Sequence, residues 1–395
     1  MNWLGLLISV LCFLIAVPYF GNVNKIFNIV ALVIIIILHR RIFIDSLLRV
    51  PILISGAFII FLVAILISSL AVNDYRSIDK ALDWWRYSAT ALLMYMLVLD
   101  KRCETSIFYG FLVALGCLSV FGLYEYIDGG CAKRIMSLSK HPNHFASMLD
   151  MILPFCIIYF IELIRNKKMA NINMTISFFV ITLGVVCLFL TGSRGGIIGT
   201  SIGLLLSFVI CCIKNLNFKS FMKYFTVVSM VTVISLGALF CFNGGKFTRS
   251  YDNERLLLIE SSYNMWSDNK IFGIGLRNWK TQYQNKYILP EAKERKLTVP
   301  HNIFAYYFAT TGLVGGIGFC MFLVVILKYL IKNLSIRNEM FFVAFAMIWS
   351  FLAINIHGLV DVGITIEKIY RLFCAEVGIT VALLETSYKV VNKDQ

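Results

Sequence analysis

The sequence has little charge. Only 15% of its residues are charged, 59% are hydrophobic, and the mean hydropathy is +0.80. A water-soluble domain of this length cannot bury so much apolar side chain, so the bilayer must solvate most of the chain. Polar stretches are also too short to form a separate soluble domain of ordinary size.

Several motifs of known chemistry are missing. The eleven cysteines show no C-x-x-C spacing of the kind that a zinc or redox site uses. Gly273-x-Gly275 lacks the strand and the third glycine of a dinucleotide fingerprint. We therefore expect no metal and no cofactor, and we expect unpaired cysteines, although Cys131 and Cys241 could pair in an oxidising compartment.

Long apolar runs fill the chain instead. A spanning helix needs about 20 mainly apolar residues, and short polar breaks divide this chain into about twelve such runs. The first run has no basic segment before it and no cleavage site, so we expect a retained helix and no signal peptide. The predicted fold is an all-α integral membrane protein with spans near 3–19, 24–39, 50–71, 82–99, 105–126, 145–164, 172–191, 195–213, 222–242, 302–330, 338–358 and 367–386.

The spans give a predicted domain organisation and an orientation. Residues 1–242 hold nine spans, 243–301 form one large loop with helices, and 302–395 hold three spans and a short tail. Basic clusters end alternate spans, and the positive-inside rule makes those loops cytoplasmic. Both termini are then predicted to be cytoplasmic, and the large loop lies outside.

The large loop is itself basic, with ten Lys and Arg residues between 243 and 301. Such a surplus attracts the phosphate or pyrophosphate of a lipid carrier or a lipopolysaccharide core. The alternative is a loop that lies on anionic membrane lipids. A nucleic-acid partner is implausible outside the membrane.

Two polar motifs supply arginine at predicted helix starts on the outer side. Arg134 precedes His141-Pro142-Asn143, where Asn143 is a reasonable helix cap and a capped helix entry is the simpler explanation of the histidine. Ser193-Arg194-Gly195 breaks two apolar spans, and an arginine there is costly unless it is paired or functional. A helix N-terminus favours anions, whereas the alternative for Arg194 is a snorkelling side chain in a tight turn.

Two further motifs follow in the second half. Arg255 lies on a predicted amphipathic helix, and Arg277 follows a glycine-rich turn, where a solvent-exposed surface charge is the alternative explanation. His301 and Asn302 start the tenth span, and a histidine can accept a proton near neutral pH, although a helix cap explains it equally well. Asp361, in the last outer break, could orient a histidine or pair with an arginine.

Together these residues resemble the bacterial O-antigen ligase and polymerase superfamily of membrane glycosyltransferases. The motifs that carry the resemblance, which extends over most of the chain, are Arg134 with His141-Pro142-Asn143, Ser193-Arg194-Gly195, Arg255 with Asp268-Asn269 and Gly273-x-Gly275, and His301-Asn302 with Thr311-Gly312 and Gly315. The resemblance implies a GT-C-like, metal-independent enzyme at the periplasmic face of the inner membrane. It also implies an undecaprenyl-diphosphate-linked glycan as donor and, for a ligase, a sugar hydroxyl of lipid A core as acceptor.

The chemistry assigns a role to each candidate. His301 is the predicted general base, and Arg194 and Arg255 hold the diphosphate and stabilise its departing charge, because arginine offers fixed bidentate positive charge. The predicted substrate-binding residues are Arg134, Arg277, Asn143, Asn302 and Asp361.

Other functions stay open. One dominant outer loop favours a ligase over an O-antigen polymerase, and a chain that ends soon after its last span argues against a protein-glycosylating member. A lipid-linked sugar flippase would show two similar halves, and no repeat relates 1–200 to 201–395.

Overall fold

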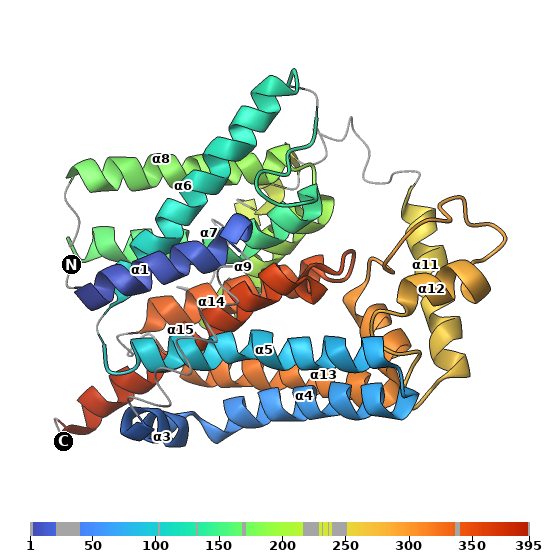
Figure 1. Cartoon of the computed structure of the whole chain (residues 1–395). Coiled ribbons are helices and arrows are strands. Elements are labelled where there is room, and N and C mark those ends of the chain that lie inside the picture. The colour runs from blue at the N-terminus through green and yellow to red at the C-terminus, as the bar shows by residue number, and fades with distance from the viewer. Residues whose placement is uncertain are drawn as a thin grey trace.

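The fold is a bundle of long helices with a small helical cap at one end (Figure 1). The computed structural model describes residues 3–20, 40–101, 103–131, 133–167, 171–215, 251–335 and 340–393, with short pieces between 229 and 238, and the regular elements in these ranges are helices. They are α1 (Trp3–Ala16), η1 (Pro18–Phe20), α3 (Arg40–Arg49), α4 (Ile52–Val72), α5 (Tyr75–Val98), α6 (Glu104–Asp128), α7 (Pro142–Arg165), α8 (Asn171–Leu190), α9 (Arg194–Asn215), α11 (Tyr251–Asp268), α12 (Trp279–Gln282), η2 (Tyr283–Tyr287), α13 (Ile303–Asn333), α14 (Phe341–His357), η3 (Gly363–Thr365) and α15 (Glu367–Lys393).

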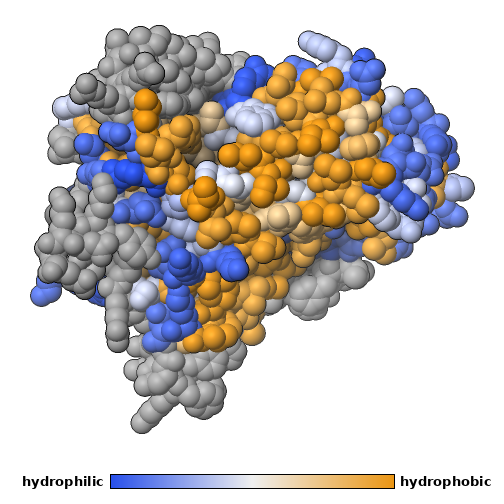
Figure 2. All heavy atoms as spheres, turned by 90° about the horizontal axis from the view of Figure 1, so that it is seen from below, coloured by the Kyte–Doolittle hydropathy of each residue, from blue (hydrophilic) through white to orange (hydrophobic). Residues whose placement is uncertain are grey.

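Six of the described helices are long and apolar enough to cross a membrane: α4, α6, α7, α8, α9 and α13. They coincide with six of the predicted spans, which confirms a multi-pass helical protein. Figure 2 shows a broad hydrophobic band over the bundle and a hydrophilic end where the cap lies. Side chains such as Ile67 on α4 and Val324 on α13 are apolar and exposed, as a lipid-facing surface requires.

The other predicted spans have different outcomes. The runs near 3–19 and 338–358 correspond to the shorter apolar helices α1 and α14. The runs near 82–99 and 367–386 lie within α5 and α15, which are long helices that carry more charge. The run 24–39 and most of 222–242 lie outside the described residues, as does Cys241, so the total of twelve spans stays a prediction.

The break in α13 is the main irregularity of the bundle. Gly312 has φ +64° and ψ −159°, a backbone conformation that favours glycine, and it interrupts the helical hydrogen bonds. Residues 270–275 replace them: Leu313 and Val314 donate to the carbonyls of Lys270 and Ile271 at 2.8 and 3.2 Å. The carbonyls of Ala309 and Thr310 accept from the backbone N–H groups of Ile274 and Gly275. Residues 270–275 therefore complete a helix of the bundle.

The cap consists of α11, α12 and η2, within the predicted loop 243–301. Buried Glu254 of α11 accepts hydrogen bonds from the backbone N–H groups of Lys293 and Glu294. Trp279 of α12 donates to the Ser262 hydroxyl at 2.9 Å and so joins α12 to α11. Both chain ends lie at the other end of the bundle (Figure 1). This arrangement places the cap and the termini at opposite ends.

Candidate active site

The turn before α9 places Arg194 at the first position of that helix. The Ser193 hydroxyl accepts from Gly196 N at 3.3 Å, which caps the helix start. Gly195 packs so closely on the segment before Asp361 that an added Cβ would lie 2.6 Å from Val360 Cγ2. A side chain at Gly195 would therefore push α9 away from this segment.

Arg134 wraps around the same turn. Its Nε donates to the carbonyl of Thr191 at 2.7 Å, and its NH2 donates to Asn143 Oδ1 at 2.8 Å. Asn143 is buried at the start of α7, where His141 is the N-cap and accepts from Asn143 N. Arg134 therefore fixes the N-terminal ends of α7 and α9 side by side. The sequence motif predicted the helix start, and the structure moves the cap from Asn143 to His141.

An ion pair of Arg194 connects α9 with the cap, where Arg255 also lies. Arg194 binds both carboxylate oxygens of Asp252, a bidentate pair, with NH1 to Oδ2 at 3.1 Å. The Arg194 side chain is 13% exposed and that of Asp252 is 32% exposed, so solvent reaches the pair mainly from the carboxylate side. Arg255 lies one turn further along α11 and is half-buried, close enough for its charge to act on His357. The cap therefore holds a second arginine, one turn along α11 from the aspartate that Arg194 binds.

His301 and Asp361 form a pair on neighbouring loops. His301 Nδ1 lies 3.4 Å from Asp361 Oδ1, and the side chains are 21% and 5% exposed. Ile303 N donates to Gly358 O, and Asn302 Nδ2 donates to Leu359 O, so two hydrogen bonds align the loops. His301 has φ +51°, and holding a non-glycine residue there costs about 1–2 kcal/mol.

The charge of Asp361 is stabilised by this arrangement. Burial raises the pKa of Asp361, but the hydrogen bond with His301, the nearby His357 and the backbone N–H of Val362 outweigh it. The net result holds this pKa well below its ordinary value. A negative Asp361 favours the His301 tautomer with its proton on Nδ1 and directs Nε2 away from the carboxylate.

A second histidine–aspartate pair lies inside the bundle. His357 Nδ1 is 2.6 Å from Asp150 Oδ2, and the side chains are 1% and 0% exposed. His357 Nε2 faces the Ser193 hydroxyl at 3.3 Å, and Thr200 donates to Asp150 Oδ1 at 2.7 Å. This network therefore supports the turn that carries Arg194.

Asp150 and His357 are not among the site residues that the sequence predicted. Asp150 lies in an apolar run, where a carboxylate is expensive unless it has a partner, and that cost was the available signal. Its partner is 207 residues away in the sequence, so no local pattern connects them.

Histidines gather at this end of the bundle. The rings of His141 and His144 are 5.4 Å apart, and the charges of Asp361, Arg134 and His301 act on His141. Burial lowers the pKa of His141, Asp361 opposes that shift, and Arg134 adds to it. With His301 and His357, four of the five histidines in the sequence belong to this cluster.

Two further predicted site residues, Arg277 and Asn302, make contacts that hold the fold together. Arg277, with φ +65°, binds Asp79 at 2.8 Å and Asp83 at 3.1 Å, so its charge is balanced on α5. Asn302 is the N-cap of α13 and accepts from Ala305 N at 2.9 Å. Direct roles of either residue in substrate binding stay predictions.

Metal ligands are not evident in the described part of the chain. Within it, no three His, Cys, Asp or Glu side chains converge as a metal site. Metal independence itself stays a prediction, which the activity assay below addresses. What the cluster offers chemically is a partly accessible histidine beside a buried carboxylate, together with arginines suited to an anion.

Comparison with known families gives one match. Residues 178–320 match the family model described as O-Antigen ligase (Wzy_C). The matched range contains Arg194, Arg255, Arg277 and His301, whereas Arg134 and Asp361 lie outside it. No curated protein matches the chain.

Proposed function

We propose, from the match of residues 178–320 to the O-antigen ligase family, that the chain transfers a glycan from undecaprenyl diphosphate to a sugar hydroxyl of lipid A core. We further propose that transfer takes place at the periplasmic face of the bacterial inner membrane, in a GT-C-like and metal-independent enzyme. The observation that carries the proposal is the position of the His301–Asp361 pair beside the Arg194 turn, both of which contact the segment from His357 to Asp361.

His301 is the general base of the proposed reaction. Its Nδ1 faces Asp361, so Nε2 takes the proton of the acceptor hydroxyl. The acceptor oxygen attacks the anomeric carbon with inversion and forms the new glycosidic bond. The bond from that carbon to the diphosphate oxygen breaks, and its electron pair leaves with undecaprenyl diphosphate.

Arg194 and Arg255 stabilise the departing diphosphate. Guanidinium groups bind phosphate oxygens in a bidentate manner, and this interaction strengthens as negative charge develops on the leaving group. In the structure Asp252 occupies the Arg194 guanidinium with the same bidentate geometry. We propose that the diphosphate competes with Asp252, so that donor binding loosens the connection between α9 and α11.

The testing experiment uses the purified full chain, without added metal and with a chelator. It receives a diphosphate-lipid-linked glycan and lipid A core, and a gel resolves the products. Glycan on the core supports the proposal. Longer glycan that stays on the carrier lipid replaces it with an O-antigen polymerase.

A vesicle arm separates transfer from transport. The full chain is reconstituted into sealed vesicles that carry labelled donor. Donor that crosses the bilayer without any new glycosidic bond contradicts a transferase and favours a flippase. The His301→Ala variant is the matched control, because it removes the proposed base from an otherwise identical chain.

A further inference from the structure

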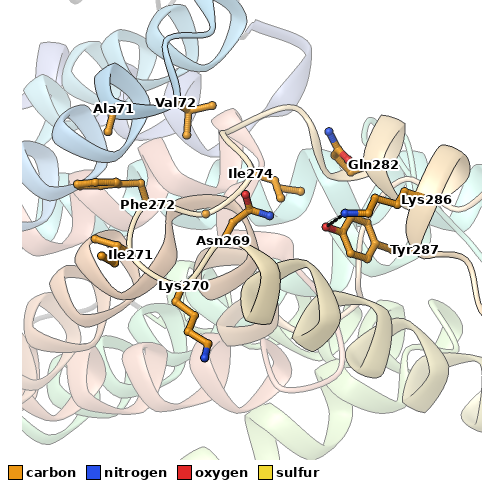
Figure 3. Close-up of a pocket in the computed structure, with 11 residues that line it drawn as sticks. Ala71, Val72, Asn269, Lys270, Ile271, Phe272, Ile274, Gln282, Lys286 and Tyr287 are labelled. Carbon is orange, nitrogen blue, oxygen red and sulfur yellow. Dashed lines mark hydrogen bonds between the residues drawn. The ribbon is translucent and has the colours of Figure 1, made fainter.

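A cavity of ≈ 600 Å³ lies between the outer end of α4 and the cap, apart from the histidine cluster. Ala71 and Val72 form one wall, residues 269–274 form the second, and Gln282, Lys286 and Tyr287 form the third (Figure 3). A volume of this size is typical of small-molecule sites and is large enough for sugar residues. None of the residues assigned above to catalysis or diphosphate binding lines it.

The polar side of the cavity carries amide, hydroxyl and ammonium groups. Figure 3 shows Asn269 between the 270–274 segment and the Lys286–Tyr287 pair, while the Lys270 side chain points away from Gln282. Amides and hydroxyls can donate to and accept from sugar hydroxyls, and an ammonium attracts an anion. The lining therefore suits a saccharide that carries negative charge.

Lys286 is held in position before any ligand arrives. Its Nζ donates to Asp268 at 2.9 Å and to the Tyr287 hydroxyl at 3.0 Å, and it lies 4.7 Å from the centre of the Tyr287 ring. The Tyr287 hydroxyl also donates to Asp268 at 2.8 Å. The hydrogen bonds to Asp268 and Tyr287 raise the pKa of Lys286 above its ordinary value. A fixed charge loses less entropy on binding than a mobile surface lysine does.

The position of the cavity points to a lipid-anchored ligand. Ala71 and Val72 are the last two residues of α4, a helix that is long and apolar enough to cross a membrane. Ile67 and Leu70, just before them, are 45% and 54% exposed and offer an apolar surface to acyl chains. A lipid whose chains lie along α4 would present its headgroup to the cavity.

The cavity is also connected to the start of α13. Backbone groups of residues 270–274, which form one wall of the cavity, make hydrogen bonds with the backbone around Gly312 of α13. His301 lies just before the same helix. Ile303 and Thr311 are separated by about 12 Å of helix at 1.5 Å per residue. An oligosaccharide could therefore occupy the cavity with one part and reach His301 with another.

We propose that this cavity binds the phosphorylated saccharide headgroup of a membrane lipid and, resting on the proposed function, that this lipid is the glycan acceptor. The cavity holds the acceptor headgroup while the reactive hydroxyl lies at His301. Recognition uses the Lys286 ammonium for phosphate and the Asn269 and Gln282 amides for sugar hydroxyls.

The test measures lipid binding by the full chain in phosphatidylcholine nanodiscs, with no donor present. The probes are fluorescent lipid A core, its dephosphorylated form, and phosphatidylglycerol as competitor. The variants are Ala71→Trp, which fills the cavity and changes no charge, and the double variant Gln282→Ala/Lys286→Ala. Lys296→Ala is the matched control, because it removes an exposed charge from the same outer segment away from the cavity.

We expect both cavity variants to weaken binding of lipid A core about tenfold or more, since charge-assisted hydrogen bonds are lost or blocked. Lys296→Ala should bind as the wild type does. Unchanged binding by both cavity variants overturns the proposal. Equal binding of the dephosphorylated form overturns the role given to phosphate, and equal competition by phosphatidylglycerol overturns the role given to the saccharide.

Transfer kinetics separate this proposal from the proposed function. Ala71→Trp should raise KM for the acceptor about tenfold with kcat nearly unchanged. An unchanged KM in an active enzyme overturns the acceptor site and leaves the transferase intact. Absence of transfer by the wild type, with binding lost in the cavity variants, overturns the transferase and leaves a saccharide-lipid site.

Discussion

The two histidine–aspartate pairs use the same side chains in opposite surroundings. His301 and Asp361 are 3.4 Å apart on loops, and the histidine is 21% exposed. His357 and Asp150 are 2.6 Å apart between helices, and neither side chain is more than 1% exposed. The first histidine can reach a substrate, whereas the second is enclosed by the bundle.

The difference in exposure suits the two pairs to different roles, one in proton transfer and one in stabilising the fold. A base must meet its substrate and exchange a proton, which needs access and a carboxylate that orients the ring. A buried pair does neither, and removing one partner leaves an uncompensated polar group inside the protein. We therefore expect His301 variants to lose activity while they keep stability, and His357 variants to lose stability first.

The largest expected effect is that of His301→Ala on transfer. Loss of a general base lowers kcat by about 10²–10⁴-fold. The donor should still bind, because Arg194 and Arg255 are unchanged. Gel-resolved transfer and donor binding to the purified variant measure the two effects. Near-normal transfer by a folded His301→Ala protein would show that another group removes the proton.

His357→Ala should lower stability more than activity. It leaves Asp150 buried without its main partner, which costs about 3–5 kcal/mol. Thermal unfolding of the purified protein measures the loss. The double variant His357→Met/Asp150→Leu removes both charges and should recover most of the stability. If the single variant unfolds as the wild type does, the pair does not support the Arg194 turn.

Arg194→Lys should reduce transfer about 10–100-fold, because an ammonium cannot reproduce the bidentate guanidinium fork. The matched variant Asp252→Asn removes the competing carboxylate and should tighten donor binding. Donor affinity and kcat, measured separately, test both. A fully active Arg194→Lys enzyme would mean that a point charge is sufficient.

Asp361→Asn should lower kcat for transfer about tenfold, less than His301→Ala does, because an amide orients the His301 ring less firmly than a carboxylate. Steady-state transfer kinetics of the purified variant measure the fall. A wild-type kcat in Asp361→Asn would show that the carboxylate does not orient the base.

The same carboxylate gives a stability prediction with a fixed sign. The pKa of Asp361 is lower in the folded protein than the ordinary value of about 3.9. Its contribution to stability is therefore present above the unfolded pKa and is lost as the pH falls through the folded one. Thermal unfolding of wild type and Asp361→Asn between neutral and acidic pH should differ most near neutrality.

The smallest expected effect is that of Asn302→Ala, which removes the α13 cap. N-cap losses cost about 1 kcal/mol. Asn302→Ser keeps a capping oxygen and should restore most of the stability. An unchanged Tm in Asn302→Ala would show that the capping hydrogen bond does not stabilise the protein.

The sequence predicted the helical fold because hydrophobic runs are a local property, and it named several polar residues that the structure places close together. Apolar runs indicate spans, and six of them match helices long enough to cross a membrane. Arg194 was recognisable from the cost of an arginine between apolar runs, and the family match includes it. His301 and Asp361 were both candidates on the outer side, and the structure brings them together.

Long-range pairing was not available from the sequence. Asp150 and His357 meet only because α7, α9 and α14 pack together, and Arg277 turns to Asp79 and Asp83 because its segment crosses α5. These contacts depend on three-dimensional packing, which a linear pattern does not encode.

The break in α13 has a consequence for biogenesis. Residues 270–275, which supply the backbone partners around Gly312, leave the ribosome before α13 does. The helix therefore finds its missing hydrogen-bond partners already synthesised when it enters the membrane, and no later segment is required to close the gap. The order of synthesis matches the order in which these two segments must meet.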